Sequence, residues 1–194
     1  MNLLTLALAG IIAYLLGSIP FGVIFSQLFK GVDVRSGGSK HMGALNTWRM
    51  VGLLPAVLVA FGDMAKALLA IKIAQFLDPT GWAMPVAGAM AVVGHCWPIY
   101  VGFRGGVGIA SGMAMIFYLA PRAALVTVAI WGVWVAILRH FPRSQAAIAV
   151  TAPFVLWAFH SPPQALLLGS LAGGVIFLRH IPELKRETFT RGLR

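Results

Sequence analysis

Charged side chains, and acids above all, are scarce in this sequence. Only 10% of its 194 residues are charged, and five Asp and Glu stand against fifteen Lys and Arg, giving a net charge of +10. A soluble domain carries about 25% charged residues. The composition therefore excludes a soluble globular protein, a disordered chain and an ordinary basic DNA-binding domain. With 59% hydrophobic residues, the chain is predicted to be an all-α polytopic integral membrane protein.

Cysteine is scarce as well, and no histidine is followed by an acidic residue at a catalytic or metal-binding spacing. Cys96 is the only cysteine, which excludes a disulfide framework and a cysteine-based zinc site. None of the five histidines has an acid five residues later, the general-base spacing of soluble acyltransferases, or the His-Glu-x-x-His metal spacing. We expect His140 and His160 to lie at the membrane interface.

Long runs without charge predict about seven transmembrane helices, since a helix that crosses a bilayer needs about 20 apolar residues. Five spans are expected at residues 3–29, 51–77, 82–103, 108–120 and 123–138. Residues 144–178 carry no formal charge, and the sequence His160-Ser161-Pro162-Pro163 divides them into two further spans. We expect a turn at Asp78-Pro79-Thr80-Gly81 and one membrane-embedded domain over residues 1–194.

The distribution of basic residues predicts the orientation. With seven spans, twelve of the fifteen Lys and Arg residues fall on the side of the C-terminus: Lys30, Arg35, Lys40, Arg49, Arg104, Arg139, Arg143, Arg179, Lys185, Arg186, Arg191 and Arg194. Lys66 and Lys72 fall within the second span, and only Arg122 falls on the other side. Because cytoplasmic loops carry an excess of Lys and Arg, we expect the N-terminus outside and the C-terminus in the cytoplasm.

A polar loop at residues 31–49 combines Gly, Ser, Asn and basic side chains. Glycines let backbone N–H groups approach an anion, Ser39 and Asn46 can donate hydrogen bonds, and Arg49 can bind a phosphate with two N–H groups. This pattern favours a phosphate site. The alternative is a positive loop that contacts anionic lipid headgroups.

A glycine-rich segment precedes the fourth predicted span. Gly105, Gly106 and Gly108 lead directly into a hydrophobic helix, which favours an anion site made of backbone donors at a helix N-terminus. The segment lacks the Gly-Lys-Ser/Thr ending of a Walker A loop. Close helix packing is the alternative explanation for such glycines.

Charged residues also lie inside or beside the spans. Asp63 and Lys66 are three residues apart, so they lie on one helix face and can pair with each other; contact with substrate is the alternative, because charges within a membrane are usually paired or functional. Arg179 and His180 end the last span. They are interpreted as an ordinary basic flank, to which His180 adds a side chain able to bind a phosphate or hydroxyl.

Together these segments resemble the acyl-phosphate:glycerol-3-phosphate acyltransferases, the PlsY family of bacterial inner-membrane enzymes. The resemblance extends from Gly17 to Arg186 and rests on five blocks in order: Gly17-Ser-Ile-Pro-Phe-Gly22, the 38–46 loop with Arg49, Asp63-x-x-Lys66, Gly94-His95-x-x-Pro98 and Phe103-Arg-Gly-Gly-x-Gly108. Family members have seven membrane helices in the orientation expected above.

The resemblance implies transfer of a fatty acyl group from acyl phosphate to the 1-hydroxyl of glycerol 3-phosphate. The products are lysophosphatidic acid and phosphate, formed in phospholipid synthesis at the cytoplasmic face of the bacterial inner membrane. Partners are the two substrates and membrane lipids, with no metal, cofactor or nucleic acid, and a monomer is compatible with this chemistry. No acyl-enzyme is needed, because acyl phosphate is already activated, and a substrate phosphate oxygen can serve as the base.

Site residues carried over by position form two groups. The resemblance implies catalytic roles for Ser39, Arg49 and His180. It implies substrate-binding roles for Gly38, Lys40, His41, Gly43, Ala44, Asn46, Lys66, Arg104, Gly105, Gly106, Gly108 and Ser111.

Four positions depart from the family pattern. His41, Leu45, Val107 and Glu183 stand where the family has Asn, Thr, Lys and Asn, so a phosphate-binding Lys is lost and an acid stands where a phosphate ligand is expected. Three hypotheses therefore stay open. They are the standard reaction, a divergent paralogue that acylates another polar acceptor, and a non-catalytic lipid-binding or transport protein on the same scaffold.

Overall fold

The computed structural model describes residues 2–184, and these residues form helices joined by turns, which confirms the all-α class. The α-helices are α1 (Leu3–Gly17), α2 (Phe21–Lys30), α3 (Ala44–Met50), α4 (Leu53–Leu77), α5 (Ala83–Cys96), α6 (Ile109–Leu119), α7 (Pro121–Leu138), α8 (Phe141–Ala158) and α9 (Pro163–His180). Short 3-10 helices lie at Val34–Ser36, Ile99–Val101 and Ile181–Glu183. Four of the basic residues used for the predicted orientation, Lys185, Arg186, Arg191 and Arg194, lie outside the described residues.

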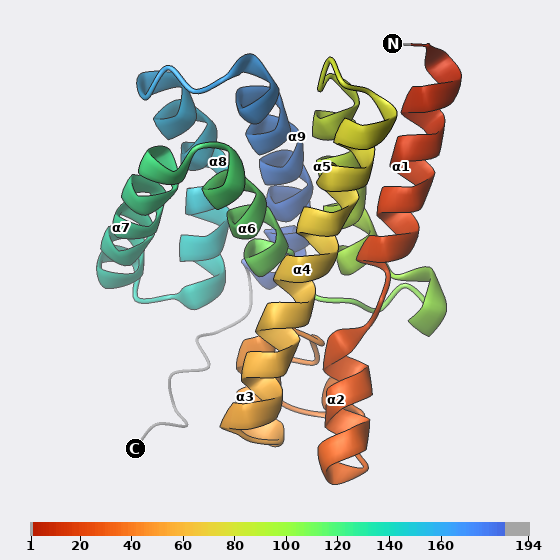
Figure 1. Cartoon of the computed structure of the whole chain (residues 1–194). Helices are drawn as coiled ribbons and strands as arrows, with labels where there is room; N and C mark the ends of the chain where they lie inside the picture. The colour runs from red at the N-terminus through yellow and green to blue at the C-terminus, as the bar shows by residue number, and fades with distance from the viewer. Residues whose placement is uncertain (1, 185–194) are drawn as a thin grey trace.

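The first predicted span is two helices rather than one. α1 ends at Gly17 and α2 begins at Phe21, because Pro20 has no N–H to continue the helix. The Ser18 hydroxyl donates to the carbonyl of Tyr14 at 2.8 Å and satisfies part of the broken end. The break redirects the chain, so that α2 lies with α3 beside the first half of α4, beyond the rest of the bundle (Figure 1).

The α-helix of the third predicted span is shorter than the span itself. α5 ends at Cys96 instead of continuing to residue 103, since Pro98 disfavours helical backbone at the residue before it. The predicted turn after α4 is confirmed by Asp78, whose carboxylate accepts the N–H groups of Thr80 and Ala83. α6 has 11 residues and rises about 16 Å, less than the roughly 30 Å of a bilayer core.

Five stretches of the described residues are long and apolar enough to cross a membrane. They are Leu3–Lys30, Leu53–Leu77, Ala83–Val101, Pro121–Leu138 and Pro163–Glu183. α6 is an apolar helix below this length, and α8 is not among the five. An integral membrane protein is thus supported, and the count of seven spans stays a prediction.

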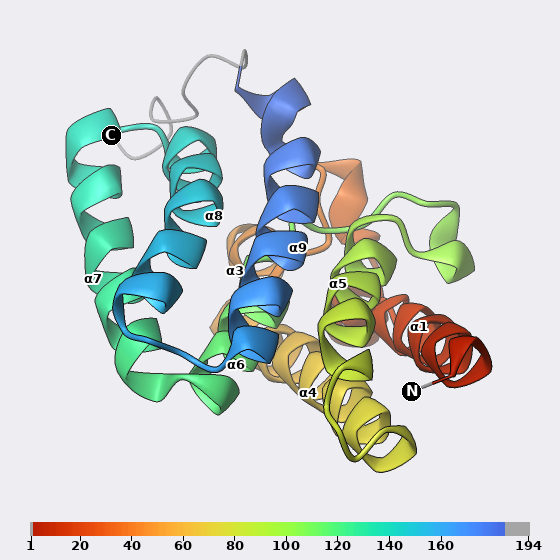
Figure 2. The same ribbon diagram turned by 90° about the horizontal axis from the view of Figure 1, so that it is seen from above.

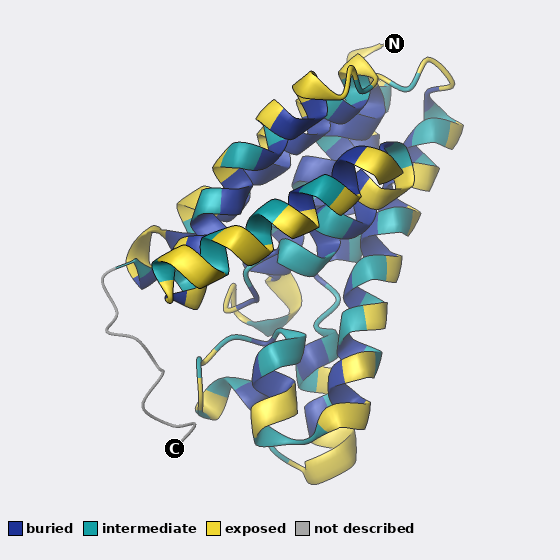
Figure 3. Ribbon diagram, turned by 90° about the vertical axis from the view of Figure 1, so that its left-hand side faces the viewer, coloured by how far each residue is buried: buried dark blue, intermediate teal, exposed yellow. Residues whose placement is uncertain are grey.

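The long helices pack in a row that is visible from above in Figure 2. α1 contacts α5, α5 contacts α9, α9 contacts α8, and α8 contacts α7. α4 contacts α1, α5 and α6 across this row. Figure 3 shows exposed residues on the outward faces of the outer helices and buried residues between them, as expected for a bundle whose outer surface meets lipid.

Small residues allow α1 and α5 to pack closely against each other. A Cβ atom on Gly17 would collide with the backbone of Ala91, and one on Gly94 would collide with the carbonyl of Tyr14. Helices in a membrane associate through such close contacts, since lipid chains are as apolar as the side chains they replace. A Cβ atom on Gly22 would likewise collide with the backbone of Met42. The first and last glycines of the Gly17–Gly22 block are therefore packing residues.

Candidate active site

A cavity of about 640 Å³ lies between the 31–43 loop, the ends of α5 and α9, and helices α3, α4, α6, α7 and α8. Its polar lining comes from Ser39, His41, Asn46, Arg49, Asp63, His95, His140, Gln145, His180 and Glu183. Its apolar lining comes from Leu45, Val107, Ile109, Met113, Phe117, Val128, Trp131, Phe141 and Pro142. A cavity of this size with walls of both kinds suits a ligand that has a polar head and an apolar tail.

One carboxamide holds the polar loop in shape. Asn46 is 2% exposed, and its Oδ1 accepts the backbone N–H of Ser39 at 2.9 Å. Its Nδ2 donates to the carbonyls of Val34 (2.8 Å), His41 (2.9 Å) and Gly37 (3.2 Å). Gly38 has φ +57°, and a Cβ there would collide with Asn46 Oδ1. Asn46 therefore acts as an internal brace for the loop that brings Ser39 to the cavity.

The glycine-rich segment is packed against the end of α5. The Gly106 N–H donates to the His95 carbonyl at 3.0 Å, and a Cβ on Gly105 or Gly106 would collide with His95. Arg179 Nε donates to the Gly106 carbonyl at 3.1 Å. Gly105 and Gly106 thus serve close packing, whereas Gly108 lines the cavity at the N-terminus of α6, where φ is +87°.

A buried charge cluster connects α4 and α5. Asp63 Oδ1 lies 2.8 Å from Lys66 Nζ and 3.3 Å from His95 Nδ1. Lys66 Nζ also donates to the carbonyl of Ile19 at 2.8 Å, and the Ser111 hydroxyl donates to the carbonyl of Asp63 at 3.1 Å. The predicted pair of Asp63 and Lys66 is confirmed. Asp63 and His95 line the cavity, while Lys66 bonds inside the protein.

His180 is fixed on the cavity wall by two contacts. Its Nδ1 lies 2.7 Å from the carbonyl of Ile176, and its Nε2 lies 3.0 Å from Oε1 of Gln145. The ring is 0% exposed to the outside but borders the cavity. Gln145, on the first turns of α8, therefore sets the orientation of this imidazole.

His41 lies between a cation and an acid. Its Nδ1 is 3.3 Å from Nη2 of Arg179 and 3.4 Å from the carbonyl of Gly105, and its Nε2 is 3.3 Å from Oε1 of Glu183. Burial, together with the charge of Arg179, lowers the pKa of His41 below its usual value despite the opposing effect of Glu183. A neutral ring with the proton on Nε2 accepts from Arg179 and directs its N–H toward Glu183. The contact with Glu183 is electrostatic, since it lies outside hydrogen-bond alignment.

The structure brings nine of the fifteen predicted site residues to the cavity. These are Gly38, Ser39, His41, Gly43, Ala44, Asn46, Arg49, Gly108 and His180. The other six lie outside its lining: Lys40, Lys66, Arg104, Gly105, Gly106 and Ser111. Lys40 and Arg104 are exposed, whereas the remaining four are buried in the packing described above.

Three residues of the cavity lining were not identified as site residues from the sequence. His95 meets Asp63 only because α4 and α5 pack together, so a search at fixed spacing does not find the pair. Gln145 had no motif to identify it. His140, expected at the interface, is 4% exposed, lines the cavity and accepts the N–H of Arg143 at the start of α8 at 3.3 Å; its position at the membrane interface stays a prediction. Within residues 2–184, no cluster of three or more His, Cys, Asp or Glu side chains suits a metal ion.

Comparison with known proteins gives one consistent result. The family model described as glycerol-3-phosphate acyltransferase matches residues 7–189. A protein named glycerol-3-phosphate acyltransferase from Rubrobacter xylanophilus is 36% identical over 172 residues, covering 88% of this chain and 85% of the relative. One of the same name from Coxiella burnetii is 43% identical over 143 residues, covering 74% of each chain.

Solved structures agree with the sequence relatives. The crystal structure of PlsY (YgiH), described as an integral membrane glycerol 3-phosphate acyltransferase, superimposes in its glycerol 3-phosphate form with a TM-score of 0.81 at 32% identity, covering 93% of this chain and 90% of that chain. The lysophosphatidic acid form gives a TM-score of 0.79 at 31% identity.

Proposed function

The chain belongs to the glycerol-3-phosphate acyltransferase family, and on this premise we propose that it transfers a fatty acyl group from acyl phosphate to glycerol 3-phosphate in phospholipid synthesis. The cavity is the observation that carries this proposal. Its polar lining suits two phosphorylated groups, and its apolar lining from α6 and α7 suits a fatty acyl chain. Amphiphilic donors and products need both surfaces in one site.

Four residues are assigned to the substrates. Ser39 and Arg49 bind the phosphate of the acceptor, because a hydroxyl on the braced loop and a guanidinium on α3 supply charge-assisted donors. The backbone at Gly108, where α6 begins, binds the donor phosphate through the N–H groups of the first helical turn. His180, held by Gln145, contacts the acceptor.

The reaction needs no covalent intermediate. The acceptor hydroxyl oxygen attacks the acyl carbonyl carbon, the bond from that carbon to the phosphate oxygen breaks, and the hydroxyl proton passes to a substrate phosphate oxygen. Holding both substrates in one cavity supplies much of the rate by proximity. Backbone N–H groups at the start of α6 stabilise the negative charge that develops on the phosphate and carbonyl oxygens.

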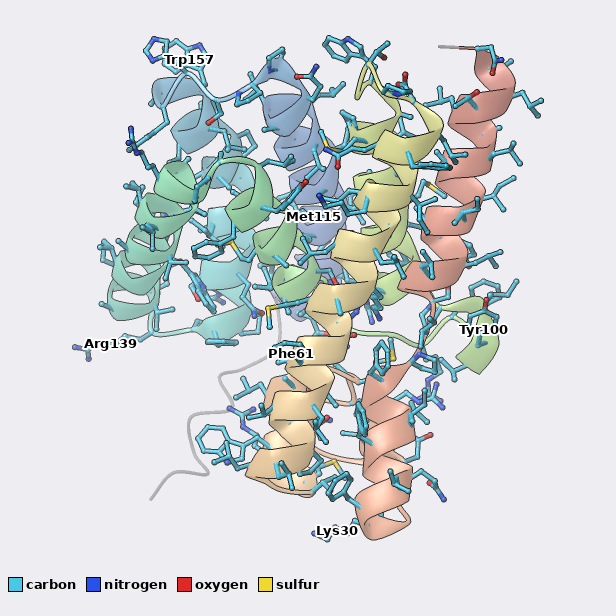
Figure 4. The ribbon with its side chains drawn as sticks, viewed as in Figure 1. Lys30, Phe61, Tyr100, Met115, Arg139 and Trp157 are labelled. Atoms are coloured by element: carbon cyan, nitrogen blue, oxygen red, sulfur yellow. The ribbon has the colours of Figure 1, made fainter. Side chains whose placement is uncertain are left out.

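The proposal includes seven membrane crossings by a single, monomeric domain, with the cavity open to the cytoplasm of the bacterial inner membrane. The α1–α2 unit and helices α4 to α9 supply seven segments. The distribution of basic residues supports the orientation. In Figure 4, Lys30 lies at the end of the molecule opposite Trp157, and Arg139 lies at the end of α7 that is turned away from Trp157, which supports a cytoplasmic face on that side.

The test uses purified protein with palmitoyl phosphate and glycerol 3-phosphate, and measures lysophosphatidic acid by mass spectrometry and released phosphate. Ser39→Ala and Arg49→Ala are each expected to lower turnover by about 100-fold, since each removes a donor to a charged group, with little change in melting temperature. Arg122→Ala, which removes a cation outside the cavity lining, is the matched control. Folded wild-type protein that forms no lysophosphatidic acid would refute the standard reaction.

A second candidate is acyl transfer to a different polar acceptor. It is favoured by the cavity lining, because Leu45, Val107 and Glu183 all face the cavity and none offers a positive charge to a phosphate. A screen of glycerol, other polyols and their phosphates with palmitoyl phosphate separates the two candidates. If kcat/KM is higher for an acceptor without phosphate than for glycerol 3-phosphate, that acceptor is the substrate and the second candidate is correct.

A further inference from the structure

Glu183 introduces a carboxylate into a cavity that has to accept anions. It is 7% exposed and stands on the Ile181–Glu183 turn that follows α9. It shares the cavity lining with Ser39 and Arg49. An ionised acid that faced a bound phosphate would weaken its binding by like-charge repulsion. The position of this carboxylate therefore affects the affinity for substrate.

His41 is placed to control that carboxylate. It comes from the polar loop, 142 positions before Glu183 in the chain, and its Nε2 lies 3.3 Å from Glu183 Oε1. On the other side of the ring, Nδ1 lies 3.3 Å from Nη2 of Arg179. Since one neutral imidazole offers one acceptor and one N–H, the ring can accept from the guanidinium at Nδ1 while its Nε2–H attracts the carboxylate electrostatically.

Arg179 is itself restrained. Its Nε donates to the Gly106 carbonyl at 3.1 Å, and its guanidinium carbon lies 5.9 Å from the centre of the Trp97 ring. The guanidinium is thus fixed to the glycine-rich segment. The series Arg179, His41 and Glu183 connects three separate parts of the cavity wall: α9, the polar loop and the turn after α9.

We propose that His41 is a positioning residue that holds the Glu183 carboxylate toward the imidazole and away from the bound phosphate, and so sets the affinity for the phosphorylated acceptor. This inference rests on the proposed function of the cavity. A neutral ring between Arg179 and Glu183 agrees with the lowered pKa of His41. Arg179 polarises the imidazole and increases the positive partial charge on the Nε2 side of the ring, which lies 3.3 Å from the acid.

A double-mutant cycle tests the coupling. His41→Ala is expected to raise KM for glycerol 3-phosphate about tenfold, with a smaller change in kcat, because residues in contact couple by this order of magnitude. Glu183→Gln alone is expected to leave KM at or below the wild-type value. In the double variant His41→Ala/Glu183→Gln, KM is expected to return to within about twofold of wild type. An undiminished tenfold increase in the double variant would overturn the proposal.

A conservative variant separates positioning from other roles. His41→Gln keeps one acceptor for Arg179 and one donor for Glu183, so its KM is expected to stay close to the wild-type value. A KM as high as that of His41→Ala would contradict the bridge. Melting temperatures of each variant identify any that fail to fold.

The dissociation constant for glycerol 3-phosphate is also measured by calorimetry for the wild type and the same variants. This measurement needs no turnover. If wild-type protein binds glycerol 3-phosphate but forms no product, the proposed reaction fails and the cycle on binding still decides the role of His41. If wild-type protein turns over and the cycle is additive in both readouts, only the positioning role fails. Absence of binding and turnover overturns both.

Discussion

Removing the acid from the buried pair of Asp63 and Lys66 is expected to destabilise the fold severely. The side chains are 2% and 3% exposed, and their charged atoms are 2.8 Å apart. Asp63→Asn preserves the shape but leaves the Lys66 ammonium with only the Ile19 carbonyl and the face of the Phe21 ring, whose centre is 5.8 Å away, as favourable partners for its charge. Breaking a buried pair in this way costs about 3–5 kcal/mol.

For a chain of this size, about 1 kcal/mol shifts the melting temperature by roughly 2–4 °C, so Asp63→Asn is expected to lower it by about 6–20 °C. The measurement is thermal unfolding in detergent, followed by tryptophan fluorescence. The double variant Asp63→Asn/Lys66→Met removes both charges and is expected to recover most of the loss. If Asp63→Asn has the melting temperature of the wild type, or if the double variant is no more stable than the single variant, the ion pair does not stabilise the fold as argued.

Three further outcomes follow from the loops. Asn46→Ala removes the brace of the polar loop and is expected to lower turnover by about 100-fold through misplacement of the site, measured with the product assay; near-normal turnover would show that the loop holds without it. Gly106→Ala forces a methyl group into the adjacent imidazole and is expected to cost about 1–3 kcal/mol, whereas Gly43→Ala has open space around it and is the control; equal melting temperatures would contradict the packing. The hydrogen bonds from Arg35 lower the pKa of Asp33, so the stability they give is present above the ordinary Asp pKa of about 3.9 and is lost as pH falls through the lower folded pKa. Asp33→Asn is expected to show a flatter fall of melting temperature with acidification, and a wild-type slope would count against this.

Local features were predictable from the sequence. The pairing of Asp63 with Lys66 follows from helical spacing within one segment, and the turn at Asp78 follows from its residue types. The predicted ends of helices were less accurate where a proline interrupts the helix. Pro20 divides the first span and Pro98 shortens the third, although each run is apolar enough to continue, because a missing backbone N–H outweighs hydropathy.

Contacts between distant segments were not predictable in the same way. The meeting of His95 with Asp63 and of His41 with Glu183 depends on how α5, α9 and the polar loop pack, and no local spacing encodes it. The six predicted site residues outside the cavity lining show the opposite error, in which a motif predicts a contact with the cavity that the fold does not make. Glycines such as Gly105 carry the same motif whether they approach a ligand or a neighbouring helix, and only the fold distinguishes the two uses.

The brace formed by Asn46 has a thermodynamic consequence for ligand binding. Since one side chain already holds the loop by four hydrogen bonds, little conformational entropy remains to be lost when a ligand arrives. The amide hydrogen of Ser39, which donates to Asn46 Oδ1, is then protected from exchange before any ligand is added, and binding changes that protection little. An inhibitor directed at this loop meets a rigid surface, so its affinity depends on how well its shape matches the surface that already exists.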